Sequence, residues 1–216
     1  MPRNIPLVNK TILIIAACAL VIGAQAGTVI LDSSAAGTTN NSGHPTLDID
    51  PNPAWATALP GSFWISDGNT GDPGDPGYTV VPNGTTVLFS ESFFLNAPAT
   101  GGTLSVMADD TTSVIVDGTT IFAADTSPAG GFPTCSAQPI GCLTSTREDF
   151  TFADLSPYLK SGNNTIQFDV YQENKESFGL DYAGSISTGQ VPEPGSLLLL
   201  GGGLLLIGLA GRLYAK

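Results

Sequence analysis

The chain has 216 residues and a formal net charge of −12, with 19 acidic residues against seven basic ones. The imbalance is larger within residues 27–191, which hold 18 of the acidic residues but only three basic ones, Arg147, Lys160 and Lys175. A surface of this charge repels nucleic-acid phosphates and anionic lipid headgroups, so nucleic acid is not an expected partner. Without its two apolar ends the chain keeps about 165 residues, which suit one domain with its own core.

The first 26 residues have the pattern of a secretory signal peptide. Arg3 and Lys10 make the start positive, residues 12–23 form an apolar core, and residues 24–26 (Ala-Gln-Ala) form a small-x-small cleavage site. We therefore predict a signal helix within residues 1–26 and a mature chain that begins at Gly27. Secretion would place the mature chain in an oxidising compartment.

The same segment contains a second processing pattern. Residues 15–18 read Ile-Ala-Ala-Cys, which resembles a lipoprotein box and would leave Cys18 as a lipidated first residue. The run that follows Cys18 stays apolar as far as Gly23, and this favours cleavage after Ala26. Signal peptidase cleavage and lipoprotein processing are both open at this stage.

Residues 27–186 are expected to form one all-β domain, because Thr, Val, Ser, Gly, Asp and Pro dominate and no convincing amphipathic helix pattern is present. The clearest hairpin is Thr112–Phe122, where Asp117-Gly118 suits a two-residue turn. The other expected strands are Ser62–Ser66, Tyr78–Val81, Thr86–Leu95, Gly102–Ala108, Asp149–Phe152, Asn164–Gln172 and Ser177–Ser187. A single helical turn is expected within residues 154–164, and a linker at residues 187–191.

Two cysteines stay in the mature chain if Cys18 leaves with the signal peptide. Cys135 and Cys142 lie in a Gly- and Pro-rich insertion, residues 123–148, and form an even pair in an oxidising compartment. A disulfide between them would close a short loop and stabilise the fold by roughly 2.5 kcal/mol in the chain-entropy model. A metal pair is the alternative, but the mature chain has no other thiol and the single histidine, His44, is remote in sequence.

Two pairs of residues are the main candidates for ligand binding, and Trp55, Phe63, Trp64 and Tyr78 are further candidate sugar-stacking aromatics for which core packing is the more frequent role. Asp109 and Asp110 are adjacent at the end of an expected strand, and calcium prefers carboxylate and carbonyl oxygens. Two adjacent acids in a surface turn are, however, common without any metal. Tyr171 and Tyr182 are the candidate sugar contacts, because we expect both on an outward face or at the rim, where a ring can stack on a pyranose.

Catalytic residues are not expected in this chain. A serine triad needs an imidazole held beside its nucleophile, whereas His44 lies in an Asn-Ser-Gly-His-Pro stretch and no nucleophile-elbow motif is present. A carboxylate pair for glycoside hydrolysis is an alternative that the sequence leaves open, because the fold decides the separation of the two groups.

The C-terminal end is a marginal membrane span. An apolar run at residues 197–210 precedes Arg212 and Lys216, and we predict a transmembrane helix over residues 196–211. The run is short beside the ~20 residues that cross a hydrocarbon core. The basic end favours a cytoplasmic location for the last residues.

A Pro-Glu-Pro triplet, Pro192, Glu193 and Pro194, comes directly before this run. The order of triplet, glycine-bearing apolar run and basic end over residues 192–216 resembles the PEP-CTERM sorting signal of exported bacterial proteins. The resemblance implies recognition by an exosortase, removal of the tail near the triplet and transfer of the protein to the cell surface. A plain C-terminal anchor that is never processed is the alternative.

Two stretches of the mature chain resemble galactose-binding-like jelly rolls. Residues 152–170 resemble a short turn of the form L-x-x-Y-L-K-x-G-x-N that leads into a core strand, and residues 104–118 resemble the central hairpin of that fold. The resemblance implies a jelly-roll β-sandwich between the signal helix and the transmembrane helix. It does not specify a ligand, because the fold serves many functions.

The sequence therefore predicts an exported bacterial protein, anchored in the inner membrane as a precursor and then located at the cell surface or in the extracellular matrix. We expect a non-enzymatic structural or adhesive role, with an exosortase, the membrane and a polysaccharide as partners. A calcium-assisted carbohydrate-binding module and an atypical secreted glycoside hydrolase are the alternative functions.

Overall fold

The computed structural model describes residues 26–124, 126, 140, 142–143, 150–173, 175–189 and 201–202. The chain divides into two compact units, Gly27–Gly189 and a second unit made of Met1–Ala26 with Gln190–Lys216. The predicted signal helix and all but Gly201 and Gly202 of the predicted transmembrane helix lie outside the described residues, so both stay predictions. Within the part of the chain that is described, no helix is long and apolar enough to cross a membrane.

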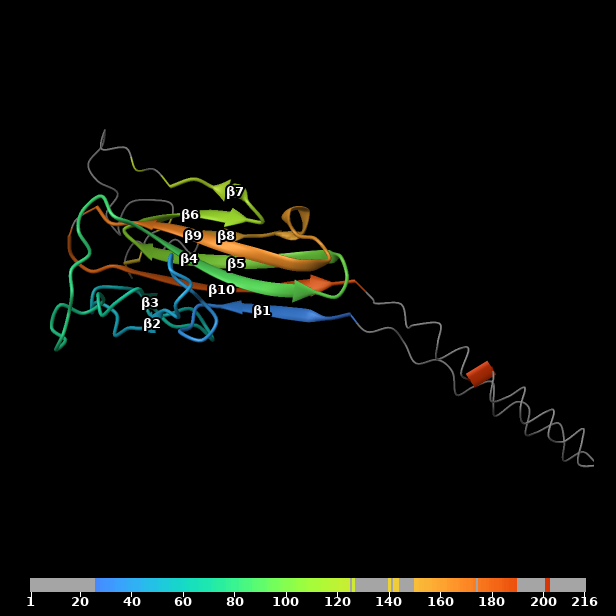
Figure 1. The fold of residues 1–216 in the computed structure, drawn as a ribbon, viewed down its shortest axis with the longest axis horizontal. Helices are drawn as coiled ribbons and strands as arrows, with labels where there is room; N and C mark the ends of the chain where they lie inside the picture. Colours follow the sequence, from blue (N-terminus) through green and yellow to red (C-terminus); the bar gives the residue numbers. More distant parts are fainter. Residues whose placement is uncertain are drawn as a thin grey trace, which may run out of the picture. The chain divides into compact units, whose positions relative to one another are not determined.

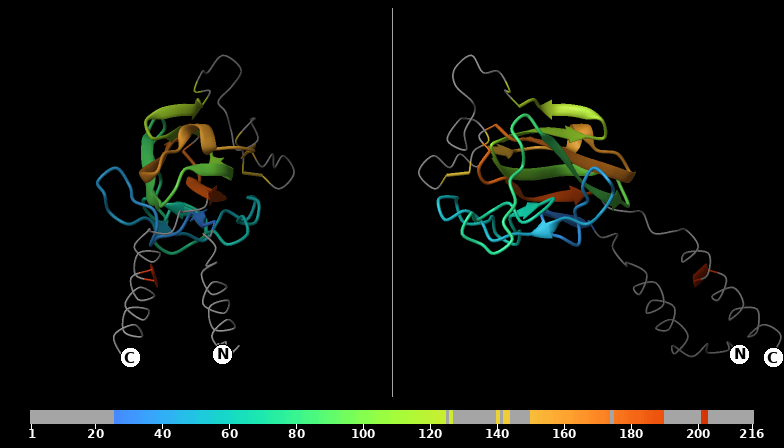
Figure 2. Two further views of the ribbon diagram at one scale, coloured as in Figure 1. Left: turned by 90° about the vertical axis from the view of Figure 1, so that its right-hand side faces the viewer. Right: turned by 60° about the vertical axis from the view of Figure 1, so that its left-hand side comes forward.

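The unit Gly27–Gly189 contains two antiparallel sheets that face each other, as Figure 1 and Figure 2 show. The first sheet has the order β2 (Leu47–Asp48), β3 (Ile65–Ser66), β10 (Gly179–Thr188), β5 (Ala99–Asp109) and β8 (Phe150–Phe152), and β1 (Thr28–Asp32) also pairs with β10. The second sheet has the order β4 (Thr86–Leu95), β9 (Gly162–Tyr171), β6 (Thr111–Val116) and β7 (Thr119–Phe122).

The connections between strands follow a jelly-roll pattern. From β4 to β10 every connection crosses from one sheet to the other, except that between β6 and β7. The exception is the predicted hairpin, and its turn residues Asp117 and Gly118 have φ values of 46° and 81°. Both values lie in the region that a two-residue hairpin turn requires. The prediction of an all-β sandwich is confirmed.

The main core lies between the two sheets because the buried residues alternate along the strands. In β9 the side chains of Ile166, Phe168 and Val170 are buried, while the residues between them are partly exposed. Across the interior, the ring of Phe168 stacks on the ring of Tyr182 from β10, with centroids 4.5 Å apart. Period-two alternation of this kind buries one face of each strand.

A second apolar cluster covers the other face of the sheet that contains β10. It is formed by Ile49, Trp55, Ala56, Leu59, Trp64, Met107 and Cys142. The rings of Trp55 and Trp64 lie 4.4 Å apart between centroids. Strand β10 is therefore buried on both faces over its first half, from Gly179 to Tyr182.

Several predicted boundaries differ from the structure. Residues 78–81 are not a strand, and the strand expected at Ser62–Ser66 is reduced to Ile65–Ser66, while β1 and β2 were not predicted. The predicted linker 187–191 overlaps β10, which continues to Thr188, and the N–H of Gly189 donates to the carbonyl oxygen of Pro98 at 3.0 Å. The expected helical turn is a single 3-10 turn, η1 (Ser156–Tyr158).

The buried carboxylate of Asp181 joins β10 to the segment between β1 and β3. Its Oδ1 accepts from the hydroxyls of Ser33 at 2.9 Å and Ser62 at 2.5 Å, and its Oδ2 accepts from the N–H of Leu59 at 2.7 Å. Asp181 is fully buried. Because buried polar groups are costly without partners, these three donors and the carboxylate stabilise one another.

We expect Asp181→Ala to lower the free energy of unfolding by about 1–3 kcal/mol, because it leaves the buried N–H of Leu59 without its acceptor and removes one of two acceptors from the hydroxyls of Ser33 and Ser62. Chemical denaturation measures the change. The matched control is Asp48→Ala, since Asp48 also accepts one backbone N–H, from Ala35 at 2.8 Å, but at an exposed position. Equal losses in the two variants would contradict the role of the buried carboxylate.

Candidate functional site

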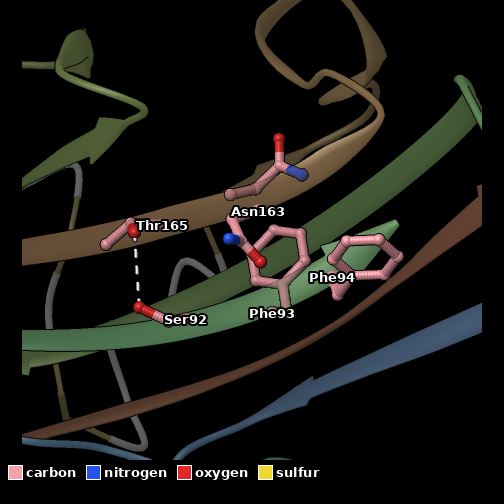
Figure 3. Close-up of a pocket in the computed structure, with 6 residues that line it drawn as sticks. Ser92, Phe93, Phe94, Asn163 and Thr165 are labelled. Atoms are coloured by element: carbon pink, nitrogen blue, oxygen red, sulfur yellow. Dashed lines mark hydrogen bonds between the residues drawn. The ribbon is translucent and has the colours of Figure 1, made fainter. Parts of the chain in front are cut away.

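A hollow of about 420 Å³ lies on the second sheet, where the end of β4 pairs with the start of β9. It is lined by Ser92, Phe93, Phe94, Asn163, Asn164 and Thr165. The register places Ser92 opposite Thr165 and Phe94 opposite Asn163. Figure 3 shows the hydroxyls of Ser92 and Thr165 turned toward each other, and these oxygens are 3.3 Å apart.

The exposed ring at the hollow results from two adjacent phenylalanines in one strand. Successive side chains of a strand point to opposite faces, so Phe93 and Phe94 cannot both enter the core. Phe93 packs against the main core, Leu95 is buried, and Phe94 is 56% exposed. The lining thus combines two phenylalanine rings, of which that of Phe94 is exposed, with two side-chain amides and two hydroxyls, and it contains no ionisable group.

The acidic pair lies at the junction of β5 and β6, and its two residues are joined by a cis peptide bond. Oδ2 of Asp109 accepts from Nε1 of Trp55 at 2.9 Å, and Oδ2 of Asp110 accepts from the N–H of Glu173 at 2.6 Å. Oδ1 of Asp109 is buried without a hydrogen-bond partner. Burial, followed by the charge of Asp110, raises the pKa of Asp109 well above its usual value, although the Trp55 donor acts in the opposite direction.

The described residues supply only part of a calcium site at this pair. Calcium takes six to eight oxygen ligands. Among the residues that the structure describes, no group of three or more His, Cys, Asp or Glu side chains could hold a metal ion. Since Asp109 is 4% exposed and Asp110 is fully buried, a proton is the simpler means of neutralising the pair.

The two candidate tyrosines occupy different environments. Tyr182 is fully buried, so the prediction that it lies at the rim and contacts sugar is wrong. Its ring faces the main core, and its hydroxyl donates to Oε2 of Glu91 at 3.0 Å and lies 2.7 Å from Oγ1 of Thr38. Tyr171 is partly exposed at the end of β9, away from the six residues that line the hollow.

Glu91 is a half-buried acid on the inward side of β4. Burial raises the pKa of its carboxyl to about 7, the hydrogen bond from Tyr182 acts in the opposite direction, and the charge of Asp32 adds to the rise. The network of Thr38, Tyr182 and Glu91 therefore links the two sheets through a group that titrates near neutral pH.

The remaining predicted residues are only partly described. Cys142 is fully buried and disulfide-bonded. Cys135 lies outside the described residues, so its pairing with Cys142 stays a prediction. His44 is exposed in a turn where its backbone N–H donates to Oδ1 of Asn40 at 3.0 Å. The triplet Pro192–Pro194 also lies outside the described residues.

Comparison with known proteins identifies the tail. Residues 190–213 match the PEP-CTERM protein-sorting motif. The recognition of this signal is therefore confirmed, and the motif indicates an exported protein that is processed at the cell envelope. No curated protein matches the chain by sequence.

Two solved structures are similar to the chain. A family 35 carbohydrate binding module from Clostridium thermocellum has 13% sequence identity and a TM-score of 0.39, and the match covers 73% of this chain and 97% of that chain. A family 35 carbohydrate binding module from an environmental isolate has 15% sequence identity and a TM-score of 0.37, and the match covers 76% of this chain and 99% of that chain. At this level neither similarity bears on the ligand of the present chain.

We expect Glu91→Gln to remove a pH dependence of stability. A carboxyl whose pKa is raised from 4.5 to about 7 binds its proton more tightly in the folded state, so its contribution to stability falls as the pH rises across that window. The amide of the variant stays neutral, and the variant should be more stable than the wild type by about 2 kcal/mol at pH 8 and equal to it at pH 4. Urea denaturation at a series of pH values measures this difference; a constant difference would contradict the assignment.

Proposed function

We propose that this chain is a bacterial surface protein with a non-catalytic structural or adhesive role, delivered by exosortase-type processing of its tail. The observation that supports the proposal most directly is the match of residues 190–213 to the sorting motif. The precursor would be held in the inner membrane by the helix predicted at residues 196–211. Its folded part would then pass to the cell surface or the extracellular matrix.

The pairing of the two ends of the sandwich supports this delivery route. Gly27 donates from its N–H to Oγ1 of Thr188 at 3.2 Å, and the N–H of Thr188 donates to the carbonyl oxygen of Gly27 at 2.9 Å. The first residue of the folded unit and the last residue of β10 are thus neighbours. Gly27, the predicted mature start, and Thr188, the end of β10, lie at the same end of the sandwich, and the main core lies wholly within residues 27–189.

The charge of the sandwich is consistent with a secreted location. Residues 27–191 carry 18 acidic and three basic residues. Such a surface promotes solubility and repels nucleic acids. Glycoside hydrolysis needs two carboxyl groups placed across the substrate. The lining of the hollow contains none, and a non-catalytic role is therefore the better proposal.

Carbohydrate binding is a second candidate function, and the exposed ring, amide and hydroxyls of the hollow are the observation that favours it. The calcium-assisted form of this function would use Asp109 and Asp110. Oδ1 of Asp109 has no hydrogen-bond partner, but among the described residues no third His, Cys, Asp or Glu side chain joins the pair to form a metal-binding group. We therefore propose that any carbohydrate binding is independent of calcium.

The tail can be tested by replacing Pro192–Pro194 with three alanines in the native host. We expect the wild-type protein to reach the surface without its tail, because the processing enzyme recognises the triplet. The variant should stay in the membrane fraction with the tail attached. Intact mass spectrometry of both fractions measures the difference. Wild-type surface protein that retains residues 192–216 would show that the tail is a plain anchor.

For the acidic pair we expect Asp109→Asn to stabilise the fold at pH 7–8. The pKa of Asp109 is higher in the folded state than in the unfolded state. The fold therefore loses stability as the pH rises above the pKa of the unfolded state, and a neutral amide at this position avoids that loss. Thermal unfolding measures the effect, and millimolar calcium should leave the Tm of both proteins unchanged. A calcium-dependent rise in Tm that Asp109→Asn abolishes would establish a cation site instead.

A further inference from the structure

We propose that the hollow formed by Phe94, Asn163, Ser92 and Thr165 binds an uncharged pyranose residue of a glycan. This inference rests on the proposed surface location and specifies the ligand class and the residues of the second candidate function. In the proposed complex, the ring of Phe94 stacks on the apolar face of the sugar. The amide of Asn163 and the hydroxyls of Ser92 and Thr165 form hydrogen bonds with the sugar hydroxyls.

The ring is available to a ligand and is held on a rigid support. Phe94 is 56% exposed, and the neighbouring residue Leu95 is 1% exposed and anchors the strand in the core. Strand β4 pairs with β9 over its whole length, from Thr86 to Leu95. A ring on such a strand loses little freedom on binding, and preorganisation of this kind lowers the entropic cost of a complex.

The polar groups lie within reach of one sugar ring. Side chains directly opposite each other on paired antiparallel strands have Cβ atoms about 4.5–5.5 Å apart, so the Asn163 amide flanks the Phe94 ring. The pair Ser92 and Thr165 lies two residues along on the same face, about 7 Å away.

The amide of Asn163 is also free to bind a ligand. It is exposed and makes no hydrogen bond within the part of the chain that the structure describes, so its donors and its acceptor are available. The hollow of about 420 Å³ falls within the range of about 300–1,000 Å³ found for small-molecule sites. An apolar body with a few polar groups is the usual composition of such a site.

The charges around the hollow favour an uncharged ligand. None of the six lining residues is ionisable. Lys160, three residues before Asn163 in the chain, pairs with Oδ2 of Asp117 at 2.7 Å. Since the mature segment carries 18 acidic residues against three basic ones, it repels uronic acids, sulfated sugars and anionic lipid surfaces. A neutral hexose polymer meets no such repulsion, and the absence of an ionisable group from the lining gives a charged sugar no ion-pair partner in the hollow.

The test uses the unit of residues 27–189, whose main core and paired ends lie within the unit itself. Affinity electrophoresis and calorimetry are run with the neutral glycans laminarin, mannan and dextran, with the anionic glycan alginate, and with vesicles of anionic lipid. We expect binding to at least one neutral glycan, no binding to alginate or vesicles, and no effect of a chelator.

Phe94→Ala should lower the affinity for that glycan at least tenfold, and Asn163→Ala should lower it about threefold or more. The matched control is Phe63→Ala, because Phe63 is 55% exposed but lies outside the hollow. The control should bind as the wild type does. Thermal unfolding of all variants verifies that each is folded.

Three outcomes would overturn the proposal. They are the absence of binding to every neutral glycan, equal losses in Phe94→Ala and Phe63→Ala, and binding to alginate or anionic vesicles alone. Delivery of Phe94→Ala to the surface of the native host is measured separately. Normal delivery with lost glycan binding supports the site, whereas failure of wild-type delivery would affect only the proposed sorting function.

Discussion

Strand β10 is the element on which the rest of the sandwich depends. Strands β1, β3 and β5 all hydrogen bond to it, and its inner side chains Leu180, Tyr182 and Ile186 enter the main core. On its other face the carboxylate of Asp181 binds Ser33, Leu59 and Ser62, so that the long segment after β1 is held against the sheet. Both apolar clusters therefore meet along one strand.

Strands with a strong alternating pattern were predictable from the sequence. Thr86–Leu95 agrees with β4 at both ends, and the Asp117-Gly118 turn was located from the residue types alone. Strand β1 was missed because its strand partner, β10, lies far away in the sequence, and nothing local to its five residues reveals that pairing. Residues 78–81 have strand-forming residue types but pair with no strand in the described part of the chain, and Val80 is 52% exposed in the loop that forms instead.

The candidate site was harder to predict, because Tyr182, Asp109 and Asp110, which the sequence analysis selected as ligand contacts, are buried in the fold. Tyr182 was expected at the rim, whereas it lies on the inner face of β10 with Leu180 and Ile186, and its ring enters the main core. Asp109 and Asp110 are likewise buried between packed elements and not exposed in a turn. The signal that the sequence analysis did not use is the pair Phe93-Phe94 in a strand that otherwise alternates, because one of these two rings has to face solvent.

The pairing of β1 with β10 joins residues that lie near opposite ends of the folded unit in the sequence. Gly27 and Thr188 are 161 positions apart, so β1 cannot pair with β10 before nearly the whole unit Gly27–Gly189 has been synthesised. Contacts of such long range are slow to form, since the entropy of a large loop is lost first. We therefore expect the chain to stay unfolded while it is exported across the membrane. The sandwich would become compact only after β10 has also been exported.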